Sequence, residues 1–313
     1  MTVLAGDLGA TRIKLGLVKD GRVLAYRTIP SHSDKPLASR LPEVAKVLRE
    51  LCDEQGFKLH ECAGIGLSVP SLVDPKSGRI MAEYGRFRDM PNLDLRQWAK
   101  AELGLRLAIE NDARMATIGE WRYGAGRGCD DLVMITLGTG LGTSVILGGR
   151  VVRGKHGQAG CLGGHLTLRY GGRACGCGNI GCAEAEASTK CLAELANARP
   201  DFAASPLARE PVLDFAAVFR QAAAGDICAT AIRDHSLLVW SSLVVSLVHA
   251  YDPELVILGG GIMASAEVIL TAVQEHVENH AHTPWGRVRV VASQLEDTAA
   301  LVAGEWLVQE QVS

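Results

Sequence analysis

The amino-acid sequence predicts an α/β protein of two lobes, one of which carries a loop held by a metal ion. The chain has 313 residues, which corresponds to about two domains, and 48% of them are hydrophobic, enough for two cores. A pattern of strands and glycine turns occurs twice, at the N-terminus and near the middle. One histidine and three closely spaced cysteines predict the metal-bound loop.

The first copy of the repeated pattern starts at the N-terminus. We expect a strand at 3–5, a turn containing Asp, Gly and Thr at 6–11, a second strand at 13–18, and a third strand from Arg22 after an Asp-Gly turn. This order of elements predicts a β-meander.

The second copy lies in the middle of the chain. A strand at 132–136 leads into the turn Leu137-Gly138-Thr139-Gly140, a strand at 142–147 and a Gly-Gly turn before Arg150. Order and spacing are nearly the same in both copies, which favours a duplication over two unrelated hairpins. Glycine lets the backbone approach oxygens closely and threonine adds a donor, so such turns suit phosphate groups. Asp7 beside a phosphate requires a cation between them, which implies Mg²⁺.

A third glycine cluster follows a buried strand. The strand at 254–258 ends in Gly259, Gly260 and Gly261, and a helix is expected over 264–277. A strand, glycine turn and helix form a seat for a flat ring and its ribose, or a plain connection between two elements.

Glu110-Asn111-Asp112 lies where a strand expected at 105–109 meets a helix expected at 115–123. Asn and Asp are good helix caps, and capping would account for one of the two. It does not require both, so a carboxylate with a chemical role remains at this junction.

The predicted metal ligands are His165, Cys175, Cys177 and Cys182. Three thiolates and one imidazole nitrogen complete a tetrahedral shell, which is what structural Zn²⁺ prefers. Chance cysteines in a loop are the alternative, but the C-x-C-x4-C spacing among glycines favours the metal. A closed shell leaves no position for substrate, so we expect the zinc to hold the loop in place.

Composition narrows the class of protein. The net charge is −3 with both signs interspersed, so there is no basic footprint for nucleic acid. No signal segment precedes the first strand, and the apolar run 236–251 predicts a buried helix, not a membrane span. Nine cysteines without a signal predict reduced thiols and a cytoplasmic protein.

Taken together, the motifs resemble the ROK family (repressor, open reading frame, kinase), and the resemblance covers nearly the whole chain. It implies an actin-like ATPase fold, in which two lobes of the ribonuclease H type close on ATP and a sugar. The motifs are Asp7-x-Gly9-x-Thr11, Glu110-Asn111-Asp112-Ala113, Gly124-Ala125-Gly126-Arg127-Gly128, Leu137-Gly138-Thr139-Gly140-x-Gly142, Gly164-His165, Cys175-x-Cys177-Gly178-x-x-Gly181-Cys182-x-Glu184 and Leu258-Gly259-Gly260-Gly261.

The resemblance also implies roles for individual residues. Asp112 matches the catalytic base, and Asn111, His165 and Glu184 match ligands of the sugar hydroxyls, with His165 also binding zinc. It further implies an N-terminal lobe at 1–115 plus 297–313, a C-terminal lobe at 116–296, and a dimer or tetramer. The nucleotide positions, for ATP with Mg²⁺, are Asp7, Gly9, Thr11, Gly138, Thr139 and Gly140 for phosphate and Gly259, Gly260 and Gly261 for adenosine.

Two segments depart from the family pattern. The usual Glu-x-Gly-His reads Cys161-Leu162-Gly163-Gly164-His165, so a sugar-binding glutamate is missing. A common sugar loop is replaced at 82–89, where Glu83, Arg86 or Asp89 are candidates to supply the lost hydrogen bonds. These departures leave the sugar open and the reaction class intact.

The sequence therefore predicts a glucokinase-like hexose kinase. An N-acylhexosamine or uncommon-sugar kinase is the alternative, followed by a non-catalytic sugar-responsive regulator. The motif at Asp7 leaves no room ahead of it for a DNA-binding helix-turn-helix. Carboxylates at Asp7 and Asp112 would hinder mere binding of phosphates, which favours turnover.

Overall fold

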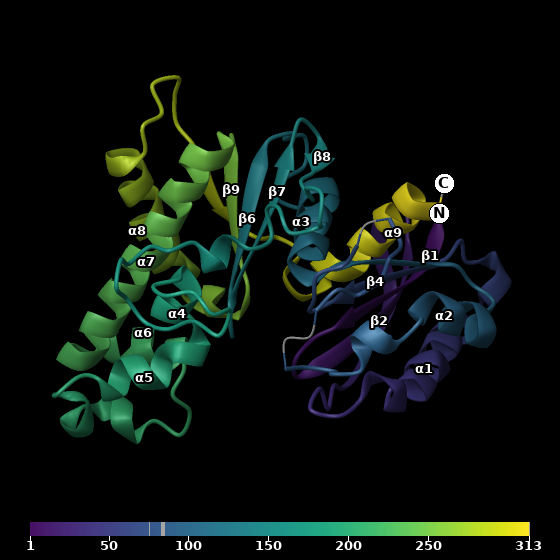
Figure 1. Ribbon diagram of the computed structural model, residues 1–313, viewed down its shortest axis with the longest axis horizontal. Helices are drawn as coiled ribbons and strands as arrows, with labels where there is room; N and C mark the ends of the chain where they lie inside the picture. Colours follow the sequence, from purple (N-terminus) through teal and green to yellow (C-terminus); the bar gives the residue numbers. More distant parts are fainter. Residues whose placement is uncertain (75, 83–84, 313) are drawn as a thin grey trace. The chain divides into compact units, whose positions relative to one another are not determined.

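The computed structural model describes residues 1–74, 76–82 and 85–312 (Figure 1). The chain divides into two compact units. Unit 1 comprises Met1–Gly128, Arg153–Ala159 and Gln294–Ser313, and unit 2 comprises Cys129–Val152 and Gly160–Ser293. The lobe limits derived from the sequence, 1–115 with 297–313 and 116–296, stay a prediction.

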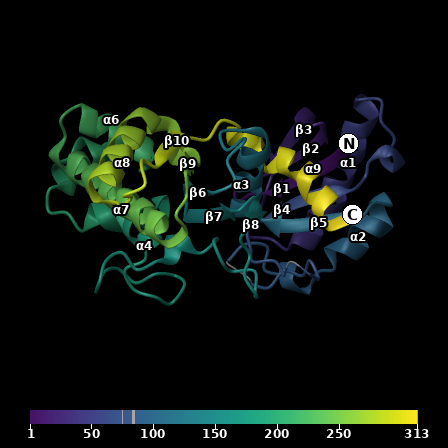
Figure 2. The ribbon, with the colours of Figure 1, turned by 90° about the horizontal axis from the view of Figure 1, so that it is seen from above.

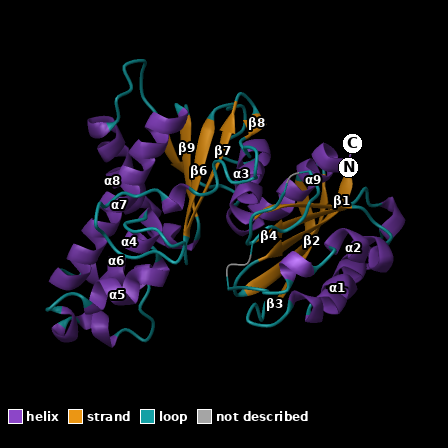
Figure 3. Cartoon of the chain, viewed as in Figure 1, coloured by secondary structure: helices purple, strands orange, loops and turns teal. Residues whose placement is uncertain are grey.

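Unit 1 is built on a five-stranded mixed sheet in the order β3-β2-β1-β4-β5 (Figure 3). The first three strands form the predicted antiparallel meander, and β4 and β5 run parallel to β1. The strands are β1 Thr2–Leu8, β2 Arg12–Lys19, β3 Arg22–Pro30, β4 Ile65–Val69 and β5 Leu107–Asn111.

Unit 2 repeats this topology. Its sheet has the order β10-β9-β6-β7-β8, with β7 antiparallel to β6 and with β9 and β10 parallel to it. Each strand of unit 1 thus has a counterpart in the same place and direction, as the predicted duplication requires. The strands are β6 Leu132–Leu137, β7 Leu141–Leu147, β8 Arg150–Val151, β9 Leu255–Gly259 and β10 Arg289–Ala292.

Helices cover both faces of the unit 1 sheet. Apolar side chains of α1 (Leu41–Glu54) and α2 (Leu95–Leu103) share one core cluster with one face. The helix α9 (Ala299–Val312) lies along β1 and β4 (Figure 2). It approaches closely because a Cβ at Gly66 would lie 2.4 Å from the Gly304 Cα, so two glycines meet at this contact. The helix α3 (Asp112–Tyr123) packs on α9.

The core of unit 2 surrounds one long helix, α7 (Ile227–Tyr251). Among the described helices, only α7 has the length and the apolar composition that a membrane span requires. In its most apolar stretch of 18 residues, 44% of the residues are buried inside the protein. Trp240, which is 1% exposed, packs on Phe215 and donates a hydrogen bond to the Ala187 carbonyl at 2.8 Å. The helix predicted at 236–251 is the second part of α7, which starts nine residues earlier, at Ile227. The helices around it are α4 Ala183–Ala187, α5 Leu192–Asn197, α6 Phe215–Ala223 and α8 Ala266–His280.

Three predicted elements at the candidate site have shifted boundaries. The first strand, expected at 3–5 before a turn at 6–11, extends over Thr2–Leu8, so Asp7 lies inside β1. The strand expected at 105–109 is β5, which lies two residues later, at Leu107–Asn111. The preceding helix α2 ends at Gly104 in the left-handed conformation, and pairing of β5 with β4 extends to Asn111. The following helix starts three residues earlier than expected, at Asp112, because Asn111 caps it. Asn111 and Asp112 therefore have different places, one before the helix and one inside its first turn.

Candidate active site and metal centre

The carboxyl ends of three parallel strands bring the unit 1 candidates together. The register pairs Asp7 of β1 with Ser68 of β4, and pairs Val69 of β4 with Asn111 of β5. In open α/β sheets, ligands bind outside the carboxyl ends of the strands. Asp7, Asn111 and Asp112 lie at that edge of unit 1.

Asp7 takes part in a small polar cluster. The Ser68 hydroxyl donates to its Oδ1 at 2.7 Å, and Lys14 Nζ lies 4.0 Å from its Oδ2. The same ammonium is 2.8 Å from Asp297 Oδ1. Burial raises the pKa of Asp7, while Ser68 and Lys14 oppose the shift. A further cation beside Asp7 would stabilise its charged form.

Lys14 of β2 lies in this cluster, with only 14% of its side chain exposed. Sequence analysis did not identify Ser68 or Asp297. The only signal for Ser68 was its position at the end of a buried strand, and Asp297 comes from the far end of the chain.

The turn after Asp7 is shaped by its backbone. A Cβ at Gly9 would lie 2.6 Å from the Arg12 carbonyl oxygen, so glycine is required there. The Ser31 hydroxyl donates to the Gly9 carbonyl at 2.8 Å, and the Ser31 N–H donates to the Thr11 carbonyl at 3.0 Å. Thr11 itself is exposed, which leaves its hydroxyl accessible.

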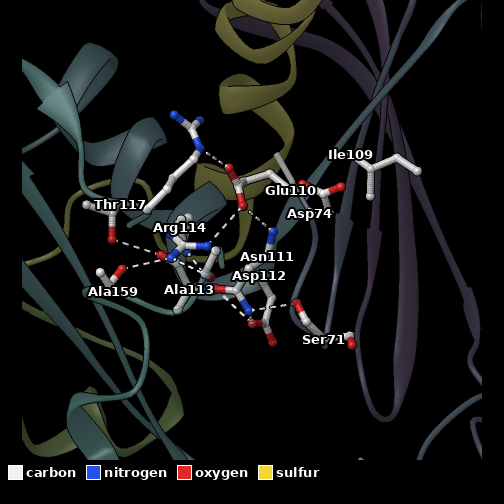
Figure 4. A network of polar contacts seen from close by, with 12 residues as sticks. Ser71, Asp74, Ile109, Glu110, Asn111, Asp112, Ala113, Arg114, Thr117 and Ala159 are labelled. Atoms are coloured by element: carbon white, nitrogen blue, oxygen red, sulfur yellow. Dashed lines mark hydrogen bonds and ion pairs between the residues drawn. The ribbon is translucent and has the colours of Figure 1, made fainter. Parts of the chain in front are cut away.

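Asn111 holds Asp112 in a defined orientation (Figure 4). Its Oδ1 accepts from the Arg114 N–H at 3.2 Å and caps α3, while its Nδ2 donates to Asp112 Oδ1 at 2.9 Å and to the Ser71 carbonyl at 3.2 Å. The Ala113 N–H also donates to Asp112 Oδ1, at 2.8 Å. Within the described residues no hydrogen bond reaches Asp112 Oδ2, so this oxygen is open to a ligand.

The environment of Asp112 disfavours its charge. The residue is exposed to water, but dense protein surrounds its carboxylate at longer range. This desolvation, followed by the negative charge of Asp7, raises its pKa to about 6, against weaker opposing effects of the Ala113 N–H and Arg86. A carboxylate with such a pKa is a stronger proton acceptor than an ordinary aspartate.

Behind this pair lies a buried ionic network. Glu110 is 2% exposed and accepts from the Asn111 N–H at 2.9 Å and from Arg153 Nε at 2.8 Å. Arg114 is fully buried, lies 3.4 Å from Glu110, and donates to the carbonyls of Gly157 and Ala159 at 2.8 Å each (Figure 4). The network ties the start of α3 to the segment 153–159.

In unit 2 the two predicted glycine loops are neighbours. Gly260 has φ +94°, and a Cβ there would lie 2.3 Å from the Leu137 carbonyl oxygen. The Gly259–Gly261 cluster therefore packs against the Gly138–Gly140 turn. The N–H groups of Thr189 and Lys190 donate to the carbonyls of Gly138 and Thr139, which fixes the shape of the turn.

His165 and Glu184 lie on either side of Leu141. Glu184 Oε2 accepts from the Leu141 N–H at 3.0 Å. A Cβ at Gly164 would lie 2.0 Å from the Leu141 carbonyl oxygen, so the residue before His165 must be glycine.

The four predicted metal ligands form one cluster in unit 2. Their ligand atoms all lie within 4.8 Å of one another. Cys177 Sγ and Cys182 Sγ are 3.7 Å apart, and Cys175 Sγ is 3.6 Å from His165 Nδ1. Tetrahedral Zn²⁺ with Zn–S near 2.3 Å and Zn–N near 2.0 Å requires separations of about 3.5–3.8 Å. The donor set and its geometry fit zinc.

Asn179 supports this cluster from its own loop. Its Nδ2 donates to Cys182 Sγ at 3.3 Å and to Thr167 Oγ1 at 2.9 Å, and its carbonyl accepts from the Cys175 N–H at 2.8 Å. The helix α4 starts directly after Cys182, which sets the position of Glu184 two residues further on.

In the segment 82–89, which replaces a common sugar loop, the structure shows what Asp89 binds. Asp89 accepts from the N–H groups of Leu37 and Ala38, at 2.6 and 2.9 Å, so its carboxylate anchors a neighbouring loop. This occupation makes it a poor candidate for the lost sugar hydrogen bond. Glu83 lies outside the described residues.

A family model described as the ROK family matches residues 3–311, and the chain belongs to that family. Glucokinase of Halalkalibacterium halodurans is 30% identical over 314 residues, covering 97% of this chain and 94% of the relative. The crystal structure of a ROK hexokinase from Thermus thermophilus has a TM-score of 0.81 and 31% identity, covering 100% of this chain and 99% of the other. A ROK glucokinase from Streptomyces griseus, in complex with glucose and AMPPNP, has a TM-score of 0.81 and 27% identity, covering 99% and 100%.

Proposed function

We propose that the protein is an ATP-dependent sugar kinase that phosphorylates a hydroxyl of a hexose. Family membership and the full-length similarity to a glucokinase support the class of reaction. The structure of a relative with glucose and AMPPNP supports a hexose and ATP as the two substrates. Glucose is the first candidate among hexoses.

The single observation that carries the mechanism is the Asp112 carboxylate. One oxygen is fixed by Asn111 and Ala113, and the other is open. A sugar hydroxyl is a poor nucleophile, so a carboxylate within hydrogen-bond reach orients it and accepts its proton as the phosphoryl group arrives. A pKa of about 6 leaves Asp112 mostly ionised at neutral pH and still a competent base.

The phosphates of ATP are assigned to three features. Asp7 would hold Mg²⁺, which neutralises phosphate charge in transfer reactions. The turns at Gly9–Thr11 and Gly138–Gly140 would supply backbone N–H groups and hydroxyls, and Gly259–Gly261 would receive adenosine. Lys14, 4.0 Å from Asp7, adds positive charge to the same edge of unit 1.

The sugar is assigned to Asn111, Asp112, His165 and Glu184. His165 Nδ1 faces Cys175, which leaves its Nε2 for a hydroxyl. Zn²⁺ bound by His165, Cys175, Cys177 and Cys182 would hold this loop without entering the reaction. Thiolate ligands need reduced cysteines, which supports a cytoplasmic location. A dimer or tetramer stays a prediction.

The test is a coupled ADP-release assay over glucose, mannose, N-acetylated hexosamines and 1- and 2-deoxy analogues, with phosphorus NMR to identify the product. We expect sugar-dependent turnover and, because the motif glutamate is missing, small losses for analogues changed near C1 or C2. A strict preference for glucose would overturn the relaxed specificity, and Glu83 would then be the first residue to mutate. ADP release that no sugar increases would overturn the kinase assignment.

A further inference from the structure

A cavity of about 650 Å³ lies in unit 1 at the amino end of β5, away from the candidate active site. It is formed by α2, the start of β5, the end of α9 and the hairpin around Lys76. Asp112 follows the opposite end of the five-residue strand, roughly 13 Å away at 3.3 Å per residue. None of the residues assigned to sugar, ATP or zinc lines this cavity.

The cavity is lined by positive charge. Among the described residues that line it, Lys76, Arg96, Lys100 and Arg106 are cationic and none is acidic. Among the described residues, Lys76, Arg96 and Lys100 form no ion pair. Like charges repel when they gather in a concave site, so an anion bound between Lys76, Arg96 and Lys100 would relieve their repulsion.

Arg96 shows that the site is built and not a chance gathering of surface charges. Its guanidinium packs on Gly78, where a Cβ would lie 2.4 Å from Nη2, so a glycine with φ +68° makes room for it. Its Nε is buried and has no hydrogen-bond partner among the described residues. A buried donor of a charged group without a partner is costly unless a ligand satisfies it.

The neighbouring carboxylates do not fill this role. Asp74 accepts from the N–H groups of Lys76 and Ser77 and from the Ser77 hydroxyl, which closes its own hairpin. Asp94 accepts from the Gln97 N–H at 2.9 Å and caps α2.

We propose that this cavity binds a small, multiply charged oxyanion of metabolite size, a bisphosphate ester being the class that fits best. Two phosphate groups carry at least as many negative charges as the three cations Lys76, Arg96 and Lys100 carry positive ones, and guanidinium groups pair with phosphate oxygens in a bidentate way. The volume exceeds what a single inorganic phosphate fills and lies in the range of small-molecule pockets. A nucleic acid would require an extended basic strip in place of a single cavity of this size.

The test is isothermal titration calorimetry of the full chain with fructose 1,6-bisphosphate as the probe, without added Mg²⁺, at fixed ionic strength. Parallel titrations with inorganic phosphate and citrate separate a bisphosphate site from a general oxyanion site. Arg96→Gln with Lys100→Gln should weaken binding by about tenfold or more, since two charge-assisted contacts are lost. Arg49→Gln, on α1 and outside the cavity, is the control and should bind as the parent does.

A second variant distinguishes this site from the active site. Lys14→Gln removes the cation beside Asp7 and should leave binding of the bisphosphate unchanged. Loss of binding in Lys14→Gln with retention in the Arg96 and Lys100 double variant would overturn the proposal. So would a parent that binds no bisphosphate at millimolar concentration, or one that binds phosphate and citrate equally well. None of these outcomes depends on kinase activity, so they are separable from failure of the proposed function.

Discussion

Replacing Asp112 by asparagine removes a proton acceptor while keeping the shape of the side chain. The amide oxygen can still accept from Asn111 Nδ2 and the Ala113 N–H, which bond Asp112 Oδ1 at 2.9 and 2.8 Å. Positioned acid–base catalysis contributes roughly 10²–10⁴-fold. We therefore expect kcat to fall by about that factor, with a smaller change in KM for ATP.

The stability of this variant separates catalysis from folding. The folded-state pKa of Asp112 is raised to about 6 from 3.8, so its contribution to stability is present at low pH and is lost as pH rises through 6. At pH 8 the ionised carboxylate therefore disfavours the folded state, and the neutral amide removes that effect. The melting temperature of Asp112→Asn at pH 8 should equal or exceed that of the parent.

The assay is kcat/KM from pH 5 to 8.5 by coupled ADP release. For the parent, the rate should rise with pH and level off above about 6, because the base acts in its ionised form. Asp112→Asn should lose this ascending limb together with its turnover. Asp94→Asn, at the cap of α2, is the control and should keep the parental profile. A folded Asp112→Asn with near-parental turnover would refute the reasoning and leave Asp112 only a residue of the first helical turn.

Three further predictions concern the supporting structure. Cys177→Ser should lose close to one equivalent of zinc per chain by elemental analysis, and it should weaken sugar binding more than ATP binding. The control variant Cys191→Ser should keep its zinc. A zinc-free parent protein with full activity would contradict the zinc site. Arg114→Met should lower the free energy of unfolding by about 3–5 kcal/mol in denaturant titration, because it leaves a buried carboxylate short of a partner; a loss below about 1 kcal/mol would contradict this. Gly66→Ala should lower the free energy of unfolding by about 1–3 kcal/mol, since its Cβ would meet the backbone of α9. Gly16→Ala should lower it less, because its Cβ would meet the flexible end of a leucine at 3.3 Å. Equal melting temperatures of the two variants would refute the packing argument.

The sequence predicted those parts of the site whose chemistry is visible in local spacing. The metal ligands are an example, since Cys175, Cys177 and Cys182 lie within one loop and His165 only ten residues earlier. The strand pattern also predicted that Asn111 and Asp112 lie where a strand meets a helix, but it placed Asp7 in a turn, whereas Asp7 lies inside β1. The spacing of residues in the sequence does not show which strand ends lie side by side in the sheet.

Partners far apart in the chain were out of reach for that reason. Ser68 is 61 residues from Asp7, and Asp297 is 283 residues from Lys14, and these contacts depend on strand order and on the return of α9 to unit 1. Asp89 was misjudged in the opposite direction. Its use by the backbone of Leu37 and Ala38 depends on loop packing that no motif records.

The duplicated topology shows how one scaffold supports two kinds of chemistry. In unit 1 the last residues of β1 before the turn include Asp7, and β5 leads into Asp112, two carboxylates that suit a metal ion and proton transfer. In unit 2 the equivalent strands end at Leu137 and Ala292, and the strand between them ends at Gly259. Residues without charge allow close approach of backbone N–H groups, which bind phosphate without adding repulsion. The two sheets thus have equivalent edges, and the residues at the strand ends fit the proposed roles, proton transfer and metal binding at one edge and phosphate binding at the other.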